Sequence, residues 1–117
     1  MERLRQRADF LAAATGAKAP GTAFVLQARK RDDDGPIRVG FTVSKKVGTA
    51  VERNRVRRRL REMVRLSKAD RMRSGHDYVL IGRRAALKAP FSRMMHDFEG
   101  ALRRVHEGRR NANVDSR

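Results

Sequence analysis

The fold is decided mainly by residues 37–66, whose sequence is IRVGFTVSKKVGTAVERNRVRRRLREMVRL. Over Ile37–Ser44 apolar and polar side chains alternate, which is typical of a strand with one buried face. The period then changes to that of a helix, which we expect to begin near Thr49 or Ala50 and to end near Leu66. One helix face is apolar (Val56, Leu60, Met63 and Val64) and the opposite face is polar and basic (Asn54, Arg58, Arg61 and Arg65).

Shorter periodic segments lie on both sides of this stretch. The alternating run before it is joined to Ile37–Ser44 by an Asp-Gly turn at residues 32–36, so the pattern predicts an antiparallel hairpin. The further predicted elements are a short helix capped by Asp9, strands at Thr22–Lys30 and Asp77–Arg83, and a helix after Pro90 with the apolar stripe Phe91, Met94, Met95, Phe98, Leu102 and Val105.

The order of these elements, α-β-β-α-β-α, predicts an α+β sandwich with helices packed on a small mixed sheet. The chain has 117 residues, which suits one domain. Neither an internal repeat nor a linker is present, so we assign residues 1–107 to that domain. The polar residues 108–117 are expected to form a disordered tail.

Composition restricts the class of function. The 29 basic and 13 acidic residues leave a net charge of +16, and 23 of the basic residues are Arg, which binds phosphate bidentately and stacks on bases. A nucleic acid is therefore the expected partner. The absence of Cys excludes disulfide scaffolds, thiolate zinc sites and cysteine nucleophiles. Since no apolar run suits a membrane span or a signal peptide, we expect a cytoplasmic protein without a membrane partner.

The positive charge is concentrated in residues 44–65, which contain nine basic side chains and two acidic ones, Glu52 and Glu62. A solvated helix face would carry more acids, and like charges one turn apart destabilise an isolated helix. A bound polyanion removes this penalty, so the segment predicts a surface that binds nucleic acid. Asn54 lies between two arginines and can offer a donor and an acceptor to a base or a ribose.

Residues 43–62 closely resemble the signature of the bacterial ribonuclease P protein component, in which Ser44-Lys45-Lys46 and a glycine precede Arg53-Asn54-Arg55. The similarity covers residues 5–106, because it continues at Asp9-Phe10, Phe24-Val25-Leu26, Arg38-Val39-Gly40 and Asp77-Tyr78-Val79.

The resemblance implies the protein subunit of a ribonucleoprotein endonuclease that removes the 5′ leader from precursor tRNA. In that family the RNA subunit holds the catalytic Mg²⁺ ions, and the protein binds this RNA and the leader and raises the affinity for substrate and Mg²⁺. The implied fold is α-β-β-β-α-β-α, similar to the second domain of a small-subunit ribosomal protein, with a left-handed β-α-β crossover around the Arg-rich helix. It has one strand more than the residue pattern predicts, and we expect the missing break between strands at the bend between Phe41 and Lys46.

Two binding surfaces follow from the resemblance. The RNA-subunit surface would consist of Lys45, Lys46, Arg53, Asn54, Arg55, Arg57, Arg58, Arg61 and Arg65. The leader surface would consist of Phe10, Val25, Gln27, Thr42 and Ser44. Ala14 and Gln27 stand where many relatives have Phe and Tyr, which reduces stacking on the leader bases.

The residues indicate no catalytic group and no metal ligand set of the protein's own. His76, His96 and His106 are expected to be separate surface histidines, and adjacent aspartates at 32–34 rarely converge on one ion. These features suit a monomeric protein whose partner RNA performs the reaction. A ribosomal structural protein is the alternative of a different class, whereas a helical DNA-binding module is disfavoured because a hairpin precedes the basic helix.

Overall fold

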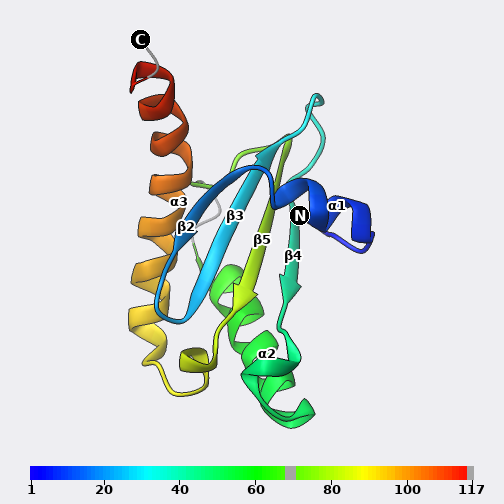
Figure 1. Cartoon of the computed structure of the whole chain (residues 1–117), viewed down its shortest axis with the longest axis vertical. Helices are drawn as coiled ribbons and strands as arrows, with labels where there is room; N and C mark the ends of the chain where they lie inside the picture. The colour runs from blue at the N-terminus through cyan, green and yellow to red at the C-terminus, as the bar shows by residue number, and fades with distance from the viewer. Residues whose placement is uncertain (68–70, 116–117) are drawn as a thin grey trace.

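A five-stranded mixed sheet carries helices on both of its faces (Figure 1). The computed structural model describes residues 1–67 and 71–115, with side chains described up to residue 107. The elements are β1 (Glu2–Arg3), α1 (Arg7–Ala13), β2 (Ala17–Pro20), β3 (Phe24–Lys30), β4 (Arg38–Thr42), the 3₁₀ helix η1 (Lys45–Val47), α2 (Ala50–Leu66), β5 (His76–Gly82), the 3₁₀ helix η3 (Arg84–Leu87) and α3 (Phe91–Asp115).

The predicted hairpin between the strands now called β3 and β4 is wrong, because β5 lies between them in the order β1-β4-β5-β3-β2. β5 is antiparallel to β3 and parallel to β4. The backbone N–H of Arg31 donates to the carbonyl of Gly75 and that of Gly75 donates to the carbonyl of Gly35, each at 2.7 Å. The chain leading into β5 therefore passes between the two ends of the Asp-rich loop.

Gly75 is required at this crossing. Its φ of 71° is in the left-handed region, and a Cβ atom added there would lie 2.5 Å from the carbonyl oxygen of Asp33. Only glycine accepts both constraints without a shift of the loop. The seven residues 31–37 thus span a neighbouring strand and do not form a tight turn.

The additional strand is β2, so the prediction that the missing break between strands lies between Phe41 and Lys46 is wrong. β2 pairs antiparallel with β3, with Ala17 opposite Ala28. The expected position is occupied by the end of β4 and by η1. β2 consists of two alanines, a lysine and Pro20, so it lacks the β-branched and aromatic residues that mark a strand. The two-residue strand β1, which pairs parallel with β4, was not predicted either.

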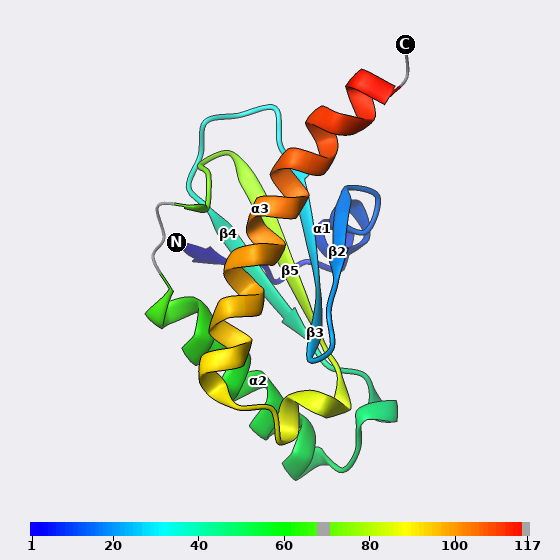
Figure 2. The same cartoon turned by 90° about the vertical axis from the view of Figure 1, so that its left-hand side faces the viewer.

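Helices α2 and α3 cover one face of the sheet, and α1 lies on the other (Figure 2). The apolar stripe predicted for α2 is confirmed, since Val56, Leu60, Met63 and Val64 are all buried. The stripe of α3 is buried at Met94, Phe98, Leu102 and Val105, whereas Phe91 and Met95 are half-buried at its side. Under α1 a smaller apolar cluster consists of Leu4, Ala13 and Val79, with Phe10 and Ile81 packed against it.

Helix α2 connects β4 to its parallel neighbour β5. In Figure 1 both strands point downward and β5 lies to the left of β4. Figure 2, in which the left-hand side of Figure 1 faces the viewer, shows α2 to the lower left of the strands, so α2 lies behind the sheet in the view of Figure 1. This path is a left-handed crossover, the unusual hand expected from the resemblance.

Helix α3 extends to Asp115, so the boundary expected at residue 107 does not coincide with a helix end. The backbone of residues 108–115 continues this helix. The apolar stripe ends at Val105, which is why the pattern did not predict the last turns. The division into a domain and a tail stays a prediction.

Candidate nucleic-acid interface

Helix α2 begins with a capping box formed by Thr49 and Glu52. Oγ1 of Thr49 accepts the backbone N–H of Glu52 at 3.2 Å, and Oε1 of Glu52 accepts the backbone N–H of Thr49 at 2.9 Å. Arg84 also pairs with Glu52 at 3.3 Å. The backbone hydrogen bond from Thr49, together with Arg84, holds the pKa of the Glu52 carboxyl below its usual value. Glu52, one of the two acidic residues within residues 44–65, therefore stabilises the start of α2.

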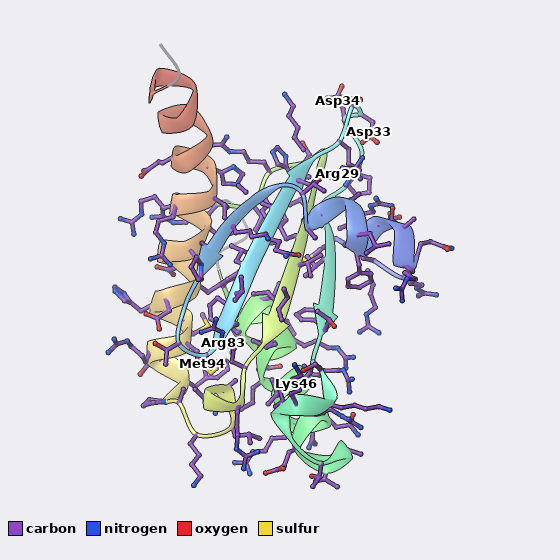
Figure 3. The ribbon with its side chains drawn as sticks, viewed as in Figure 1. Arg29, Asp33, Asp34, Lys46, Arg83 and Met94 are labelled. Atoms are coloured by element: carbon purple, nitrogen blue, oxygen red, sulfur yellow. The ribbon has the colours of Figure 1, made fainter. Side chains whose placement is uncertain are left out.

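The nine residues predicted to bind the RNA subunit lie on η1 and α2, with side chains that are exposed or half-exposed. Lys45 and Lys46 are exposed immediately before α2, and Figure 3 shows Lys46 beside the beginning of the helix. On α2, Arg57 donates to Oδ1 of Asn54 at 2.8 Å, which orients the amide. The structure therefore places these groups on two consecutive elements, η1 and α2.

The described residues of α2 border the following three shallow grooves. The groove along its crest has a volume of about 390 Å³ and is lined by Val51, Asn54, Arg57, Arg58 and Arg61. The groove between α2 and the β1–β4 edge has a volume of about 300 Å³, and its lining includes Arg3, Phe41, Arg61, Val64 and Arg65. The groove between α2 and the start of α3 has a volume of about 530 Å³ and is lined by Arg55, Arg58, Arg59, Glu62 and Phe91. Guanidinium groups border all three grooves, an arrangement suited to phosphate groups.

Arg59 has a structural role that its neighbours do not share. Its two terminal nitrogens donate to the backbone carbonyls of Ala86 and Ala89, each at 2.6 Å. Arg58 and Arg61 make no hydrogen bond or ion pair with any described side chain or backbone group. Arg59 therefore stabilises the fold, whereas Arg58 and Arg61 face solvent.

A fourth groove, of about 460 Å³, lies beside α1 on the other face of the sheet. Phe10, Gln27 and Thr42, three of the predicted leader-binding residues, line it together with Ala14. The other two do not line it, because Val25 is half-buried in β3 and Ser44 is exposed beyond the end of β4. The structure therefore brings together part of the predicted leader surface.

The groove beside α1 is also lined by several residues that were not predicted from the sequence. Arg5 and Arg7 supply cations, Phe41 supplies a second ring, and Leu11, Val79 and Ile81 complete the lining. The alternating arginines at 3, 5 and 7 were a signal for the cations, but only the packing of α1 shows where they lie. Phe10 packs directly on β4, since a Cβ atom added to Gly40 would lie 2.6 Å from its ring.

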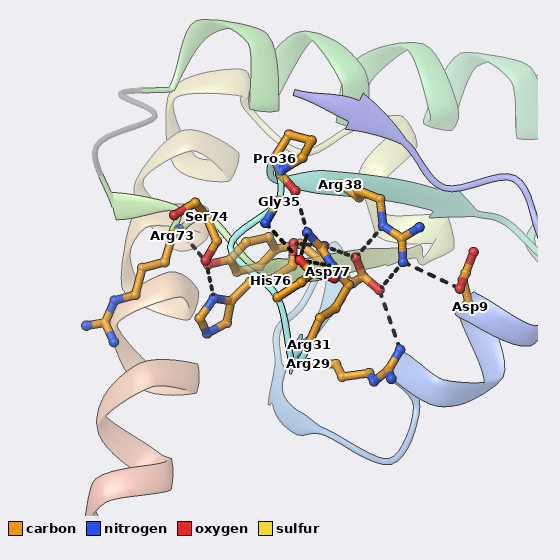
Figure 4. A network of polar contacts seen from close by, with 12 residues as sticks. Asp9, Arg29, Arg31, Gly35, Pro36, Arg38, Arg73, Ser74, His76 and Asp77 are labelled. Carbon is orange, nitrogen blue, oxygen red and sulfur yellow. Dashed lines mark hydrogen bonds and ion pairs between the residues drawn. The ribbon is translucent and has the colours of Figure 1, made fainter.

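A buried carboxylate, Asp77, fixes α1 over the sheet (Figure 4). Its oxygens accept hydrogen bonds from Arg31 at 2.5 Å and from Arg38 at 2.8 and 2.9 Å, and Arg29 lies 3.7 Å away. Arg38 also pairs with Asp9 of α1 at 3.4 Å. Burial alone would raise the pKa of Asp77, but the hydrogen bonds from Arg38 and Arg31 outweigh it and lower the pKa. This network positions the helix that carries Phe10.

His76 and His106 are not the separate surface histidines that were expected. His76 is buried, and its ring centroid lies 5.3 Å from that of His106 and 6.0 Å from that of Tyr78. The hydroxyl of Tyr78 lies 2.9 Å from Nε2 of His106 and accepts the backbone N–H of Arg73. His96 is exposed on α3, as expected. The cluster joins α3 to β5, two elements whose contact exists only in the folded chain.

No three acidic or histidine side chains among the described residues lie close enough to hold a metal ion. The acidic and histidine side chains of this part of the chain therefore do not fit a Mg²⁺ site made by the protein alone. Asp33 instead pairs with Arg31 and accepts the N–H of Gly35. Figure 3 places Asp33 and Asp34 at the end of the molecule away from Lys46.

None of the described helices is long and apolar enough to cross a membrane.

The fold and these surfaces define a small, arginine-rich nucleic-acid-binding protein of the α+β class. The family model for ribonuclease P matches residues 1–106. The ribonuclease P protein component of Ruegeria pomeroyi is 51% identical over 106 residues, 88% of this chain and 85% of that protein. That of Gluconacetobacter diazotrophicus is 50% identical over 104 residues, 88% of this chain and 90% of that protein.

Solved structures agree with the sequence matches. The RNase P protein from Thermotoga maritima is 31% identical, with a TM-score of 0.74 over 90% of this chain and 98% of that one. The RNase P protein of Staphylococcus aureus is 26% identical, with a TM-score of 0.72 over 88% and 94% of the two chains. The chain therefore belongs to the ribonuclease P protein family, the protein component of an endoribonuclease that processes the 5′ end of tRNA together with an RNA subunit. The family and the α+β fold predicted from the sequence are confirmed.

Proposed function

We propose that this protein binds two RNAs at once, with the catalytic RNA subunit on the α2 side and the 5′ leader of precursor tRNA in the groove beside α1. The observation that carries the proposal is the position of the two surfaces on opposite faces of one sheet. A single rigid sheet then sets the distance between the leader and the RNA that cleaves it.

The α2 side suits a folded RNA because it offers many cations and few acids. Arg58 and Arg61 are exposed and have no ionic partner among the described side chains. Of the two acids nearby, Glu52 caps the helix and Glu62 accepts hydrogen bonds from Arg65. The remaining guanidinium groups are available for phosphates, and Asn54 is available for a base or a ribose.

The groove beside α1 suits a single strand whose sequence varies. The ring of Phe10 offers a stacking face that accepts any base, and Arg5 and Arg7 lie at the same groove to meet the backbone phosphates. Gln27 places a polar amide in the groove where an aromatic ring would add stacking. We therefore expect leader binding that is electrostatic in large part, with modest base preference.

The chain provides positioning and charge, and we propose that the catalytic Mg²⁺ ions are held mainly by the RNA subunit. By fixing the two RNAs, the protein raises the affinity for precursor tRNA and for Mg²⁺. We further propose that the protein is a monomer before assembly and acts in the cytoplasm, where precursor tRNA is processed.

Phe10→Leu in the reconstituted holoenzyme tests the division of labour. This variant keeps an apolar side chain on Gly40 but removes the ring. It should weaken binding of precursor tRNA and leave binding of mature tRNA, which has no leader, unchanged. Arg61→Ala is the matched control and should weaken assembly with the RNA subunit instead. Equal losses for precursor and mature tRNA in Phe10→Leu would contradict the assignment of the groove.

A further inference from the structure

The groove between α2 and the start of α3 has the features of a binding site for a single nucleotide. We call it the α2–α3 groove; its lining residues are Arg55, Arg58, Arg59, Glu62 and Phe91. Its volume of about 530 Å³ lies in the range of small-molecule sites. Of the three grooves described beside α2, this one combines guanidinium groups with an aromatic ring from a second helix.

The charge of the α2–α3 groove is not balanced within the described part of the protein. Arg55 and Arg58 lie one turn apart on α2, and neither forms an ion pair or a hydrogen bond with another described residue. Glu62, the acid in the groove, accepts two hydrogen bonds from Arg65. Two like charges at this spacing repel each other, so a bound anion would relieve a penalty that the free protein carries.

The aromatic ring is held in place by the structural arginine. Arg59 lies with its guanidinium carbon 6.0 Å from the centroid of the Phe91 ring, and its hydrogen bonds to Ala86 and Ala89 fix the segment that leads into α3. Phe91 is half-buried, packed partly against the main core, and its remaining surface lies in the groove. A ring fixed in this way loses little conformational freedom when a base stacks on it.

We propose that the α2–α3 groove binds one unpaired nucleotide of the RNA subunit, with its base against Phe91 and its phosphate on Arg55 and Arg58. The proposal rests on the proposed function, since it extends the RNA-subunit surface from α2 to α3. A planar base and a phosphate match an aromatic ring beside guanidinium forks, whereas a duplex offers no free base face. The groove lies on the opposite face of the sheet from the leader groove, so the nucleotide comes from the RNA subunit.

Phe91→Trp gives a direct probe, because the chain has no other tryptophan. Stacking of a base should quench its fluorescence when the RNA subunit is added, and precursor tRNA added afterwards should cause no further change. His96→Trp is the control, on the exposed side of the same helix, and its fluorescence should change little. Equal responses of the two tryptophans to the RNA subunit would overturn the proposal, as would quenching of the Phe91→Trp variant by precursor tRNA alone.

Affinity for the RNA subunit provides a second measurement. Phe91→Leu keeps the apolar contact with the core and should weaken binding by about 5- to 100-fold, while Phe91→Tyr should restore it. If Phe91→Leu binds as tightly as the wild type while Arg61→Ala binds more weakly, the nucleotide site is wrong and the proposed function stands. If the wild-type protein does not bind the RNA subunit, both proposals fail.

Discussion

Arg58→Ala and Arg59→Ala remove neighbouring guanidinium groups that the structure assigns to different tasks. Arg59 donates two hydrogen bonds to backbone carbonyls, at about 1–2 kcal/mol each for a charged donor at a half-exposed position. Its loss should therefore lower the free energy of unfolding by about 2–4 kcal/mol. Arg58 makes no such bond within the described residues, so Arg58→Ala should leave the free energy of unfolding nearly unchanged.

Binding to the RNA subunit, in contrast, should be weakened by Arg58→Ala. If Arg58 contacts one phosphate, the slope of log affinity against log salt should fall by about 0.7–0.9 in Arg58→Ala. The assays are urea unfolding of each free protein and RNA-subunit titrations at several salt concentrations. An unchanged salt slope in Arg58→Ala, or a loss of stability as large as that of Arg59→Ala, would refute the reasoning.

Three further predictions concern the core, the buried carboxylate and the leader groove. Leu60→Ala removes a fully buried side chain and should cost about 2–5 kcal/mol in urea unfolding. Asp77→Asn removes the buried charge that Arg31 and Arg38 share and leaves them only Asp33 and Asp9 as ionic partners, so it should cost up to about 3–5 kcal/mol near neutral pH. The pKa of Asp77 is lowered on folding, so the ionised carboxylate stabilises the folded protein above about pH 4. This contribution to the free energy of unfolding is lost as the pH falls through the pKa of the folded state. Asp77→Asn should therefore flatten the acid side of a stability–pH curve. Gln27→Tyr should tighten precursor tRNA binding in filter-binding assays but not that of mature tRNA; equal tightening of both would contradict a leader contact.

The helix that carries the arginines could be predicted almost to the residue from sequence. Thr49 and Glu52 form a capping box within the sequence itself, and the buried stripe has the helical period. Both signals are local, because they depend on residues three to four positions apart. For the same reason the sequence predicted which side chains of α2 are exposed opposite the buried stripe, namely Asn54, Arg58, Arg61 and Arg65. The separate task of Arg59 was not, since its acceptors on Ala86 and Ala89 are distant in the chain.

The order of the strands could not be predicted in this way. Alternation describes one strand at a time, and a turn-like loop suggests that its two flanking strands pair. Here Gly75 and Arg31 interrupt that pairing through contacts across more than forty residues. The lining of the groove beside α1 was predicted only in part for a similar reason, because Arg5 and Arg7 reach it by the docking of α1.

The position of β5 has a consequence for how the chain acquires its structure. β5 is the last strand in the sequence and the central strand of the sheet, so β3 and β4 have no hydrogen bonds to each other before it arrives. The stripe of α2 packs against the same sheet, and a short isolated helix with crowded like charges is marginal in water. During synthesis neither RNA surface can therefore be completed until residue 82 has been added, and the chain before that point exposes unpaired strand edges. Chains truncated before residue 76 should stay unfolded, and assembly with RNA should begin only on finished domains.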